Sequence, residues 1–212
     1  MAFIVSTVSQ KGGVGKSTLA RIVAREFAAQ EWEVKIADVD VSQGTSFRWA
    51  SRRLQNGISP DIPVQQYGDI SKVLKDAELL DLVVVDGAPH ATRMTEQIAK
   101  KSDLVIIPTG PCLDDLEPSV NLANELKKKG IEKARIAFAL CRTGTDSELF
   151  DAQEYLGKTP FDVLEGYLPD RTSYRRATDE GYALTEIHFT SLRELAEKLA
   201  QSIVDKISDL NS

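Results

Sequence analysis

Three glycines, two lysines and a Ser-Thr pair lie within eight residues of the chain, in the segment KGGVGKST at positions 11–18. Glycines allow successive backbone N–H groups to turn toward one anion, and a helix that begins directly after them adds its free N–H groups and the positive end of its dipole. A lysine in such a loop can reach the β- and γ-phosphates of a nucleotide, and the hydroxyl after it can bind Mg²⁺. The segment therefore predicts a phosphate-binding loop in which Lys16 and Ser17 have these two roles.

The loop departs from the general pattern G-x-x-x-x-G-K-[ST] at its first position. Gln10 stands five residues before Gly15, where that pattern has a glycine, and a second lysine, Lys11, follows it. A glycine turn with incidental lysines is the alternative interpretation. The apolar run before the loop and the helical pattern after it argue against that alternative.

Acidic residues end two of the apolar runs. Asp38 and Asp40 close the run EVKIADVD, and Asp86 closes LLDLVVVD. Ligands of parallel sheets bind at the carboxyl ends of the strands, and a buried aspartate is costly without a cation or hydrogen-bond partners. We therefore expect Asp86 at a metal site. For Asp38 two roles stay open, a carboxylate that caps a turn or pairs with a lysine and one that acts at the metal; for His90, a solvated loop residue is favoured over a general base.

The elements that would position these residues alternate along the chain. Apolar, β-branched runs predict strands at 3–8, 33–39, 79–86, 102–108 and 134–141, and the segments between them include helical patterns at 16–30, 70–78, 114–129 and 147–156. Apolar strands separated by helices are typical of a parallel sheet that is covered on both faces. We expect an α/β fold with a mostly parallel twisted sheet and helices on both faces, in a single domain of residues 1–212.

The lysine at the start of the loop carries a family resemblance. KGGVGKST is similar to the deviant phosphate loop of the ParA/MinD family of P-loop ATPases. The resemblance implies a P-loop NTPase fold, ATP and Mg²⁺ as cofactors, and contact with the nucleotide by Lys11, Gly12, Gly13, Val14, Gly15, Lys16, Ser17 and Thr18. It also implies that Lys11 crosses a dimer interface to the phosphates of the partner's nucleotide, where a cation would act as an arginine finger does in related enzymes.

The same resemblance implies roles for the acidic residues. Asp40 matches the family aspartate that positions or activates the attacking water, and Asp86 matches the Walker B carboxylate that holds a magnesium-bound water. The expected metal site thus comprises Ser17, Asp40 and Asp86. Family members often continue with Asp-Pro-Gln, whereas this chain has DVSQ at 40–43. Gly87 is expected to let the backbone approach the γ-phosphate.

We expect two later segments to contact the adenine base of the nucleotide. Arg142 follows the strand predicted at 134–141, and the family loop at this place touches adenine. Arg142 would stack on the base or support the dimer interface, and a surface arginine is the alternative. Pro169 begins a stretch similar to a family segment that runs from a proline to a glycine twelve residues later, here Gly181. Pro169 and Asp170 are expected to line the base pocket.

Arg171, Arg175 and Arg176 lie in the same stretch. ParA-type proteins bind DNA without sequence preference when ATP dimerises them, through basic residues near this region. Two or three arginines on each subunit would give a salt-dependent attraction to DNA phosphates. Ion pairing with Asp170 or with the acidic pair at 179–180 is the other interpretation.

Composition limits the function classes. Of 212 residues, 42% are apolar and 27% charged, with a net charge of -6, so any contact with nucleic acid requires a local patch of basic residues. The lysines of ELKKKG at 125–130 are favoured by a helix C-terminus alone. Cys112 and Cys141 are expected to be buried, reduced thiols. We find neither a secretory leader nor an apolar run of about 18 residues, and the cytoplasm is the expected location.

The segment 190–210 predicts a helix that packs on the sheet. Its leucines and isoleucines recur at helical spacing, and acids mix with lysines on the opposite face. A membrane-binding helix instead presents a basic polar face. We therefore do not expect this segment to bind a membrane.

These observations together favour a magnesium-dependent ATPase of the ParA type. It would dimerise around two ATP molecules, hydrolyse them slowly by in-line attack of water, and drive plasmid or chromosome partition or the positioning of a cargo at the nucleoid. Nonspecific DNA and a small adaptor or centromere-binding protein that stimulates hydrolysis would be its partners. The chain resembles the short ParA forms without an N-terminal operator-binding domain.

Two other function classes stay open. One is a MinD-like ATPase on membranes, which the acid-containing C-terminal segment argues against. The other is a metabolic P-loop enzyme, such as a dethiobiotin synthetase or a cobyrinate-type amidase. Such an enzyme needs a substrate pocket with its own acid or nucleophile, and the sequence shows no such constellation.

Overall fold

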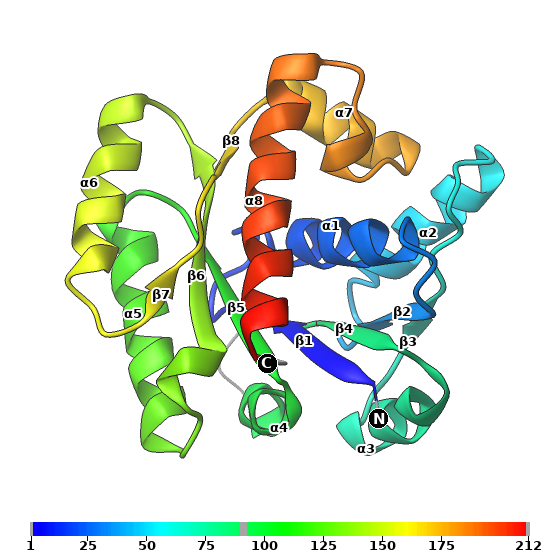
Figure 1. Cartoon of the computed structure of the whole chain (residues 1–212), viewed down its shortest axis with the longest axis horizontal. Helices are drawn as coiled ribbons and strands as arrows, with labels where there is room; N and C mark the ends of the chain where they lie inside the picture. Colours follow the sequence, from blue (N-terminus) through cyan, green and yellow to red (C-terminus); the bar gives the residue numbers. More distant parts are fainter. Residues whose placement is uncertain (1, 90–92, 211–212) are drawn as a thin grey trace.

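A parallel β-sheet forms the centre of the protein in the computed structural model, which describes residues 2–89 and 93–210 (Figure 1). Its strands are β1 (Phe3–Thr7), β2 (Val34–Asp38), β3 (Val64–Gln66), β4 (Leu82–Asp86), β5 (Leu104–Thr109), β6 (Ile136–Thr143), β7 (Asp162–Val163) and β8 (Leu168–Pro169). Hydrogen bonds join them in the order β3-β2-β4-β1-β5-β6-β7, and β8 also pairs with β6. All of these pairs are parallel, which confirms the predicted fold class.

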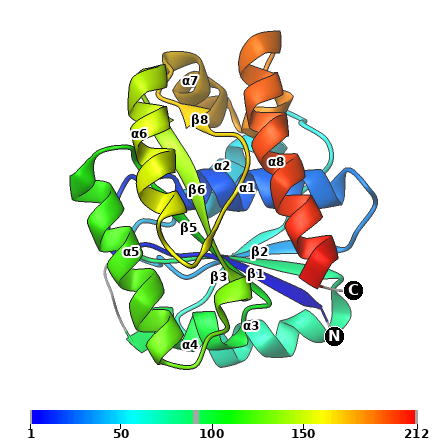
Figure 2. The same cartoon turned by 60° about the vertical axis from the view of Figure 1, so that its left-hand side comes forward.

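Helices cover both faces of this sheet. They are α1 (Lys16–Ala28), α2 (Thr45–Gln55), α3 (Ile70–Asp76), α4 (Arg93–Lys101), α5 (Leu113–Lys128), α6 (Asp146–Gly157), α7 (Thr172–Glu180) and α8 (Thr190–Leu210), with 3-10 turns η1 (Ala77–Leu79), η2 (Lys133–Arg135) and η3 (Leu184–Glu186). One apolar core joins the sheet to α1, α2, α7 and α8, and a second joins it to α3, α4, α5 and α6. Figure 2 shows α5 on one side of the strands and α8 on the other.

The continuous apolar strands follow from this double coverage. In β4, Leu82 and Val84 belong to the first core, whereas Val83 and Val85 belong to the second. Successive side chains of a strand point to opposite faces, so a strand buried on both faces must be apolar throughout. The acidic Asp86 that ends β4 is buried together with the apolar residues of the strand.

The C-terminal helix α8 packs on the sheet as predicted. Leu199, Ile203 and Ile207 are buried in the core that α8 shares with α1. Within residues 2–89 and 93–210, no helix combines the length and the apolar character that a membrane crossing requires.

The two cysteines differ in burial. Cys141 is buried near the end of β6, as predicted, but Cys112 is exposed, so that prediction was wrong for Cys112. Cys112 lies in the turn before α5, outside the buried strand β5, and its thiol donates a hydrogen bond to Asp115 on the first turn of that helix. A turn between a strand and a helix lies at the surface, which explains the exposure.

Candidate functional site

The carboxyl ends of three neighbouring strands meet at one edge of the sheet. Asp86 of β4 lies opposite Thr7 of β1 on one side and opposite Asp38 of β2 on the other. A cavity of about 500 Å³ opens at this edge, between the loops that follow these strands and the stretch 168–184. The predicted site residues that line it are Gly12, Gly13, Gly15, Lys16, Ser17, Thr18, Asp40, Gly87, Arg142, Pro169, Asp170, Arg171 and Arg175.

The loop between β1 and α1 needs its glycines. Gly13 has φ +75° and Gly15 has φ +116°, both in the left-handed region that side chains with a Cβ disfavour. Gly15 is also the N-cap of α1, and a Cβ on it would lie 3.1 Å from the Cys141 sulfur. The loop is therefore shaped so that the backbone N–H groups at the start of α1 are available to an anion.

Lys16 is a buried cation inside this loop. Its Nζ donates a hydrogen bond of 2.8 Å to the main-chain oxygen of Lys11, at the other end of the loop. Burial lowers the pKa of Lys16, and the charges of Asp86 and Asp40 oppose that shift. A bound phosphate would offer this ammonium a stronger, charged partner than the carbonyl it now contacts.

Asp86 is nearly inaccessible, with 2% of its surface exposed. Its Oδ2 accepts a hydrogen bond of 2.7 Å from the Ser46 hydroxyl, whereas its Oδ1 is buried with no partner among the described residues. Burial raises the pKa of Asp86 to about 6, while Ser46, Arg21 and Ser17 act in the opposite direction. A buried carboxylate oxygen without a partner is the feature that a cation or a metal-bound water would satisfy.

The residues of this edge fit a Mg²⁺ ion that is bound together with a nucleotide. Mg²⁺ in such sites is held by one or two carboxylates, by phosphate oxygens and by water, rather than by a cage of protein ligands. Within the described part of the chain, no group of three or more His, Cys, Asp or Glu side chains could hold a metal by itself. The unpartnered oxygen of Asp86 and the nearby Ser17 supply the donors that such a shared site needs.

Asp38 caps helix α2. It is fully buried, and its carboxylate accepts backbone N–H hydrogen bonds from Ser46 and Phe47, both at 3.1 Å, and from Asp40, also at 3.1 Å. Burial raises the pKa of Asp38, and these backbone bonds oppose the shift. Of the two interpretations that the sequence left open, the structure shows the capping carboxylate.

Asp40 lies in the loop that leads to α2. Its carboxylate accepts a hydrogen bond of 2.7 Å from the Ser42 hydroxyl, and the residue lines the cavity. Asp40 therefore faces the space in which a nucleotide would sit. The sequence DVSQ forms a turn here, in which the backbone N–H of Gln43 also bonds to Asp40.

Lys11 points away from the cavity of its own chain. Its Nζ forms an ion pair with Asp115 Oδ1 at 2.8 Å, in the first turn of α5, and 39% of its side chain is exposed. The hydrogen bond that Lys11 donates to Asp115 raises the pKa of Lys11, and burial opposes this shift. Lys11 and the buried Val14 are not among the residues that line the cavity.

Gly87 makes its closest approach to the backbone of β1. Its N–H donates to the Thr7 oxygen at 3.0 Å, and a Cβ built on it would lie only 2.6 Å from that oxygen. The glycine is therefore required by strand packing, in addition to any contact with a phosphate. The neighbouring His90 lies outside the described residues.

Arg142 connects two sides of the cavity. It has φ 58°, which is uncommon for a residue with a side chain. Its Nη1 donates to the main-chain oxygen of Gly13 at 3.0 Å, and its Nη2 lies 3.9 Å from Asp170 Oδ2. Asp170 follows β8, which pairs with β6, so Pro169 and Asp170 are held beside the phosphate loop.

The three arginines of 171–176 are exposed, and two of them lie at the rim of the cavity. Arg175 forms an ion pair with Asp170, and Arg171 donates to the Asp170 main-chain oxygen at 3.1 Å. Arg171 and Arg175 line the cavity, whereas Arg176 is not among its lining residues. The ion pair that the sequence offered as an alternative is thus formed by Arg175.

Arg21 and Ser46 are among the residues of this edge that the sequence analysis did not identify. Arg21 lines the cavity, is 3% exposed, and leaves its Nη2 without a partner among the described residues. Burial lowers the pKa of Arg21 to about 10, although Asp86 and Asp38 oppose the shift. Its position four residues after Ser17, on the same face of α1, is a signal that could have identified it.

A family model matches most of the chain. The model for the CobQ/CobB/MinD/ParA nucleotide binding domain matches residues 5–201. The chain belongs to this family.

Relatives and solved structures agree with the assignment. Protein ParA of Rhizobium radiobacter is 26% identical over 220 residues, covering 97% of this chain and 98% of the relative. Maintenance of carboxysome distribution protein A of Gloeobacter kilaueensis is 24% identical over 192 residues, covering 90% and 88%. The septum site-determining protein MinD of Pyrococcus horikoshii OT3, solved with Mg-ADP, has a TM-score of 0.77 at 19% identity, covering 100% of this chain and 99% of that one. This solved neighbour confirms the P-loop fold.

Proposed function

We propose that the chain is a ParA-type ATPase, a single domain of residues 1–212, that binds MgATP in the cavity and dimerises around two ATP molecules. Slow hydrolysis would then release the dimer and drive partition or the positioning of a cargo. The observation that carries the proposal is the buried Asp86 carboxylate, whose Oδ1 has no partner in the described structure and which lies beside a phosphate loop. A site with an unsatisfied acid and a loop of free N–H groups lacks a cation and an anion together.

The residues of this chain divide the proposed chemistry among them. The backbone of 12–17 would bind the phosphates, and Lys16 would move its ammonium from the Lys11 oxygen to the β- and γ-phosphates. Mg²⁺, held by Ser17 and through water by Asp86, would neutralise phosphate charge. Asp40, which lines the cavity, would orient the attacking water. Arg142, Pro169 and Asp170 would flank the base.

Lys11 is the residue that would make dimerisation depend on ATP. In one chain its ammonium is held by Asp115, away from the cavity. Transfer of Lys11 to the phosphates of the partner would exchange an exposed ion pair for a contact with a more highly charged group. The exchange is only available when a triphosphate is present, which is the behaviour expected of a switch.

Arg171, Arg175 and Arg176 support the proposed contact with DNA. Arg171 is the N-cap of α7 and the other two lie within its first five residues. A cation is disfavoured at the N-terminus of a helix, so the helix dipole does not explain Arg171, whereas Arg175 has a carboxylate partner in Asp170. One relative's name assigns it to the distribution of carboxysomes. By analogy we infer a cytoplasmic, nucleoid-associated protein that moves a cargo through a small adaptor protein that stimulates hydrolysis.

Sedimentation velocity with ATP and Mg²⁺ tests the proposal. The wild-type chain should sediment as a dimer with ATP and as a monomer with ADP. Lys11→Ala should bind ATP but remain monomeric, and Asp40→Ala should stay a dimer because hydrolysis stops. Lys133→Ala is the matched control, since it removes an exposed lysine in η2, before β6 and therefore at the opposite edge of the sheet. A monomeric wild type, or an unchanged Lys11→Ala dimer, would reject the switch.

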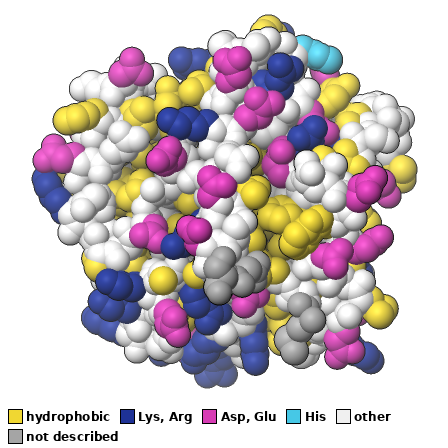
Figure 3. Space-filling view, viewed as in Figure 1, with side chains coloured by type: hydrophobic (Ala, Val, Ile, Leu, Met, Phe, Trp, Pro, Cys, Tyr) yellow, Lys and Arg dark blue, Asp and Glu magenta, His cyan; other side chains and the backbone are white. Residues whose placement is uncertain are grey.

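Co-sedimentation with DNA and with anionic vesicles distinguishes an ATPase that binds DNA from one that binds membranes. We expect the ATP dimer to pellet with DNA in a salt-dependent manner and to stay in solution with vesicles. A second basic patch, at the ends of α4 and α5, offers an internal comparison (Figure 3). Substitution of its lysines at 127–129 should leave DNA binding largely intact, whereas substitution of Arg175 and Arg176 should abolish it.

A further inference from the structure

The hydroxyl of Ser46 lies between two buried charged groups. It is 2.7 Å from Asp86 Oδ2 and 3.3 Å from Arg21 Nε, and none of the Ser46 surface is exposed. Arginine can only donate hydrogen bonds. The Ser46 oxygen therefore accepts from Arg21, and its single hydrogen must go to Asp86.

The main chain of Ser46 is fixed independently of this contact. Ser46 is the second residue of α2, and its N–H and that of Phe47 both bond to the Asp38 carboxylate. Asp38 and Asp86 are register partners on adjacent strands. The first turn of α2 is thus attached to the end of β2 by its backbone and to the end of β4 by the Ser46 side chain.

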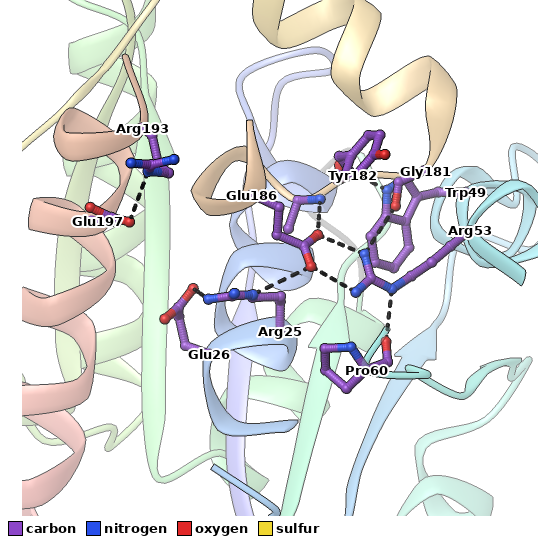
Figure 4. A network of polar contacts seen from close by, with 11 residues as sticks. Arg25, Glu26, Trp49, Arg53, Pro60, Gly181, Tyr182, Glu186, Arg193 and Glu197 are labelled. Atoms are coloured by element: carbon purple, nitrogen blue, oxygen red, sulfur yellow. Dashed lines mark hydrogen bonds and ion pairs between the residues drawn. The ribbon is translucent and has the colours of Figure 1, made fainter. Parts of the chain in front are cut away.

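The middle and the second half of α2 are hydrogen-bonded to the segment that follows α7. Figure 4 shows two of these contacts: Trp49 Nε1 donates to the Tyr182 oxygen at 3.1 Å, and Arg53 donates to the Gly181 oxygen at 3.2 Å. Arg53 also pairs with Glu186 at 2.6 Å, in a setting where the Arg53 side chain is 1% exposed. With both ends held, α2 presents the Ser46 hydroxyl to Asp86 in one orientation.

The contact differs from those of serines further along a helix, because Ser46 is the second residue of α2 and has no preceding helical turn. Serines within helices commonly return their hydroxyl to the carbonyl of the preceding turn. Ser51 in the same helix does so, on the Phe47 oxygen, and so does Ser102 after α4, on the Ile98 oxygen. Ser46 instead bonds to a carboxylate 40 residues away in the sequence.

We propose that Ser46 is a positioning residue for the magnesium-nucleotide site. Its hydroxyl holds Oδ2 of Asp86, so that Oδ1 faces the space beside Ser17, and it separates the Asp86 carboxylate from the Arg21 guanidinium. Asp86 would act on Mg²⁺ through a bound water, and outer-shell groups of a metal site commonly change metal affinity 10- to 100-fold when they are removed. The inference rests on the proposed nucleotide site, and it assigns Ser46 to the metal half of that site alone.

Magnesium titration of the nucleotide complex tests this assignment without relying on turnover. A fluorescent ADP analogue is bound to the full chain in EDTA, and Mg²⁺ is then added. Ser46→Ala should bind the analogue in EDTA as the wild type does, but it should need about tenfold more Mg²⁺ for half-saturation. Ser46→Thr, which keeps a hydroxyl, should restore most of the loss. Ser102→Ala is the matched control, because it removes a buried serine hydroxyl bonded to a helix carbonyl, at the opposite edge of the sheet.

Two results would overturn the assignment. One is an unchanged Mg²⁺ midpoint in Ser46→Ala, and the other is an equal shift in Ser102→Ala. A wild-type chain that does not bind the analogue at all rejects the nucleotide site itself, which is a distinct failure.

Hydrogen exchange on the wild type provides a measurement that does not depend on the folding of a variant. Mg²⁺ added to the ADP complex should slow exchange at the amides of 45–49 at least severalfold more than ADP alone does. Equal exchange with and without Mg²⁺ would contradict the role of Ser46.

Discussion

Replacement of Asp86 by asparagine should stabilise the metal-free chain at neutral pH. The carboxylate is buried, and burial raises its pKa from 3.8 to about 6. Because folding raises this pKa, the folded chain binds the proton more tightly than the unfolded chain does. The free energy of unfolding therefore falls as the pH rises from about 4 to about 6, and this loss is complete above the higher value.

The magnitude follows from the size of the shift. A rise from 3.8 to about 6 corresponds to about 3 kcal/mol, at about 1.4 kcal/mol for each pKa unit. Asparagine resembles the protonated carboxyl in shape and charge, and it can still accept the hydrogen bond of Ser46. The free energy of unfolding of Asp86→Asn should consequently exceed that of the wild type by about 2–3 kcal/mol at pH 7.5. At pH 4 the two free energies should differ little.

Urea denaturation in EDTA, followed by circular dichroism between pH 4 and pH 8, measures this difference. The exposed Asp151→Asn on α6 is the matched control, since it removes the same charge from the surface. With MgADP present the order should reverse, because the asparagine variant loses the metal that stabilises the wild type. A wild type and an Asp86→Asn variant of equal stability at pH 7.5 in EDTA would refute the idea that Asp86 is an unsatisfied buried charge.

Three further substitutions follow from contacts of the described residues. Asp115→Asn removes the carboxylate that pairs with Lys11 within one chain. ATP-dependent dimerisation should therefore strengthen by up to about fivefold in sedimentation equilibrium. A weaker dimer would contradict the idea that Asp115 competes with the phosphates of the partner for Lys11. Gly87→Ala places a Cβ 2.6 Å from a β1 carbonyl oxygen and should cost about 1–3 kcal/mol in urea denaturation; an unchanged midpoint would show that the strands relax freely. Glu186→Gln leaves the buried Arg53 with a neutral partner and should cost about 3 kcal/mol, whereas a loss below about 1 kcal/mol would mean that water reaches the pair.

The first βα unit could be predicted because its signals are local. An apolar run, a glycine loop and an amphipathic segment follow one another in the sequence, and each signal lies within the element that it specifies. The same holds for the strand that ends at Asp86. The roles of Lys16 and Ser17 depend on this local order, and the structure places both in the cavity wall.

Helix α2 was not predicted, because its stability comes from distant residues. The buried residues of its sequence, TSFRWASRRLQ, are Ser46, Trp49 and Arg53, and only the tryptophan among them is apolar. Its first turn is capped by Asp38 of β2, and near its far end the Arg53 side chain donates to the Gly181 oxygen, 128 positions further along the chain. Arginine side chains are mostly exposed, so the burial of Arg53 was not expected. Its ion pair with Glu186 compensates for the loss of water. The two-residue strands β7 and β8 are too short to show a period.

The site also requires knowledge of the strand order. Asp38, Asp86 and Thr7 are far apart in the sequence, and only the order β2-β4-β1 brings them into register. The parallel pattern predicted that these strand ends would meet at one edge, but not which ends would be neighbours. Ser46 could not be found for the same reason, because its role depends on the position of Asp86 beside α2.

The charges at this edge make nucleotide and metal depend on each other. The described structure buries two cations, Lys16 and Arg21, near two acids, Asp38 and Asp86, so the site has little net charge. A phosphate alone would meet the loop and Lys16 but also face the Asp86 carboxylate, and Mg²⁺ alone would meet Asp86 but also face Lys16 and Arg21. Bound together, each ion screens the repulsion that the other meets. Coupling of this kind is reciprocal, so Mg²⁺ should raise the affinity for ADP by the same factor by which ADP raises the affinity for Mg²⁺.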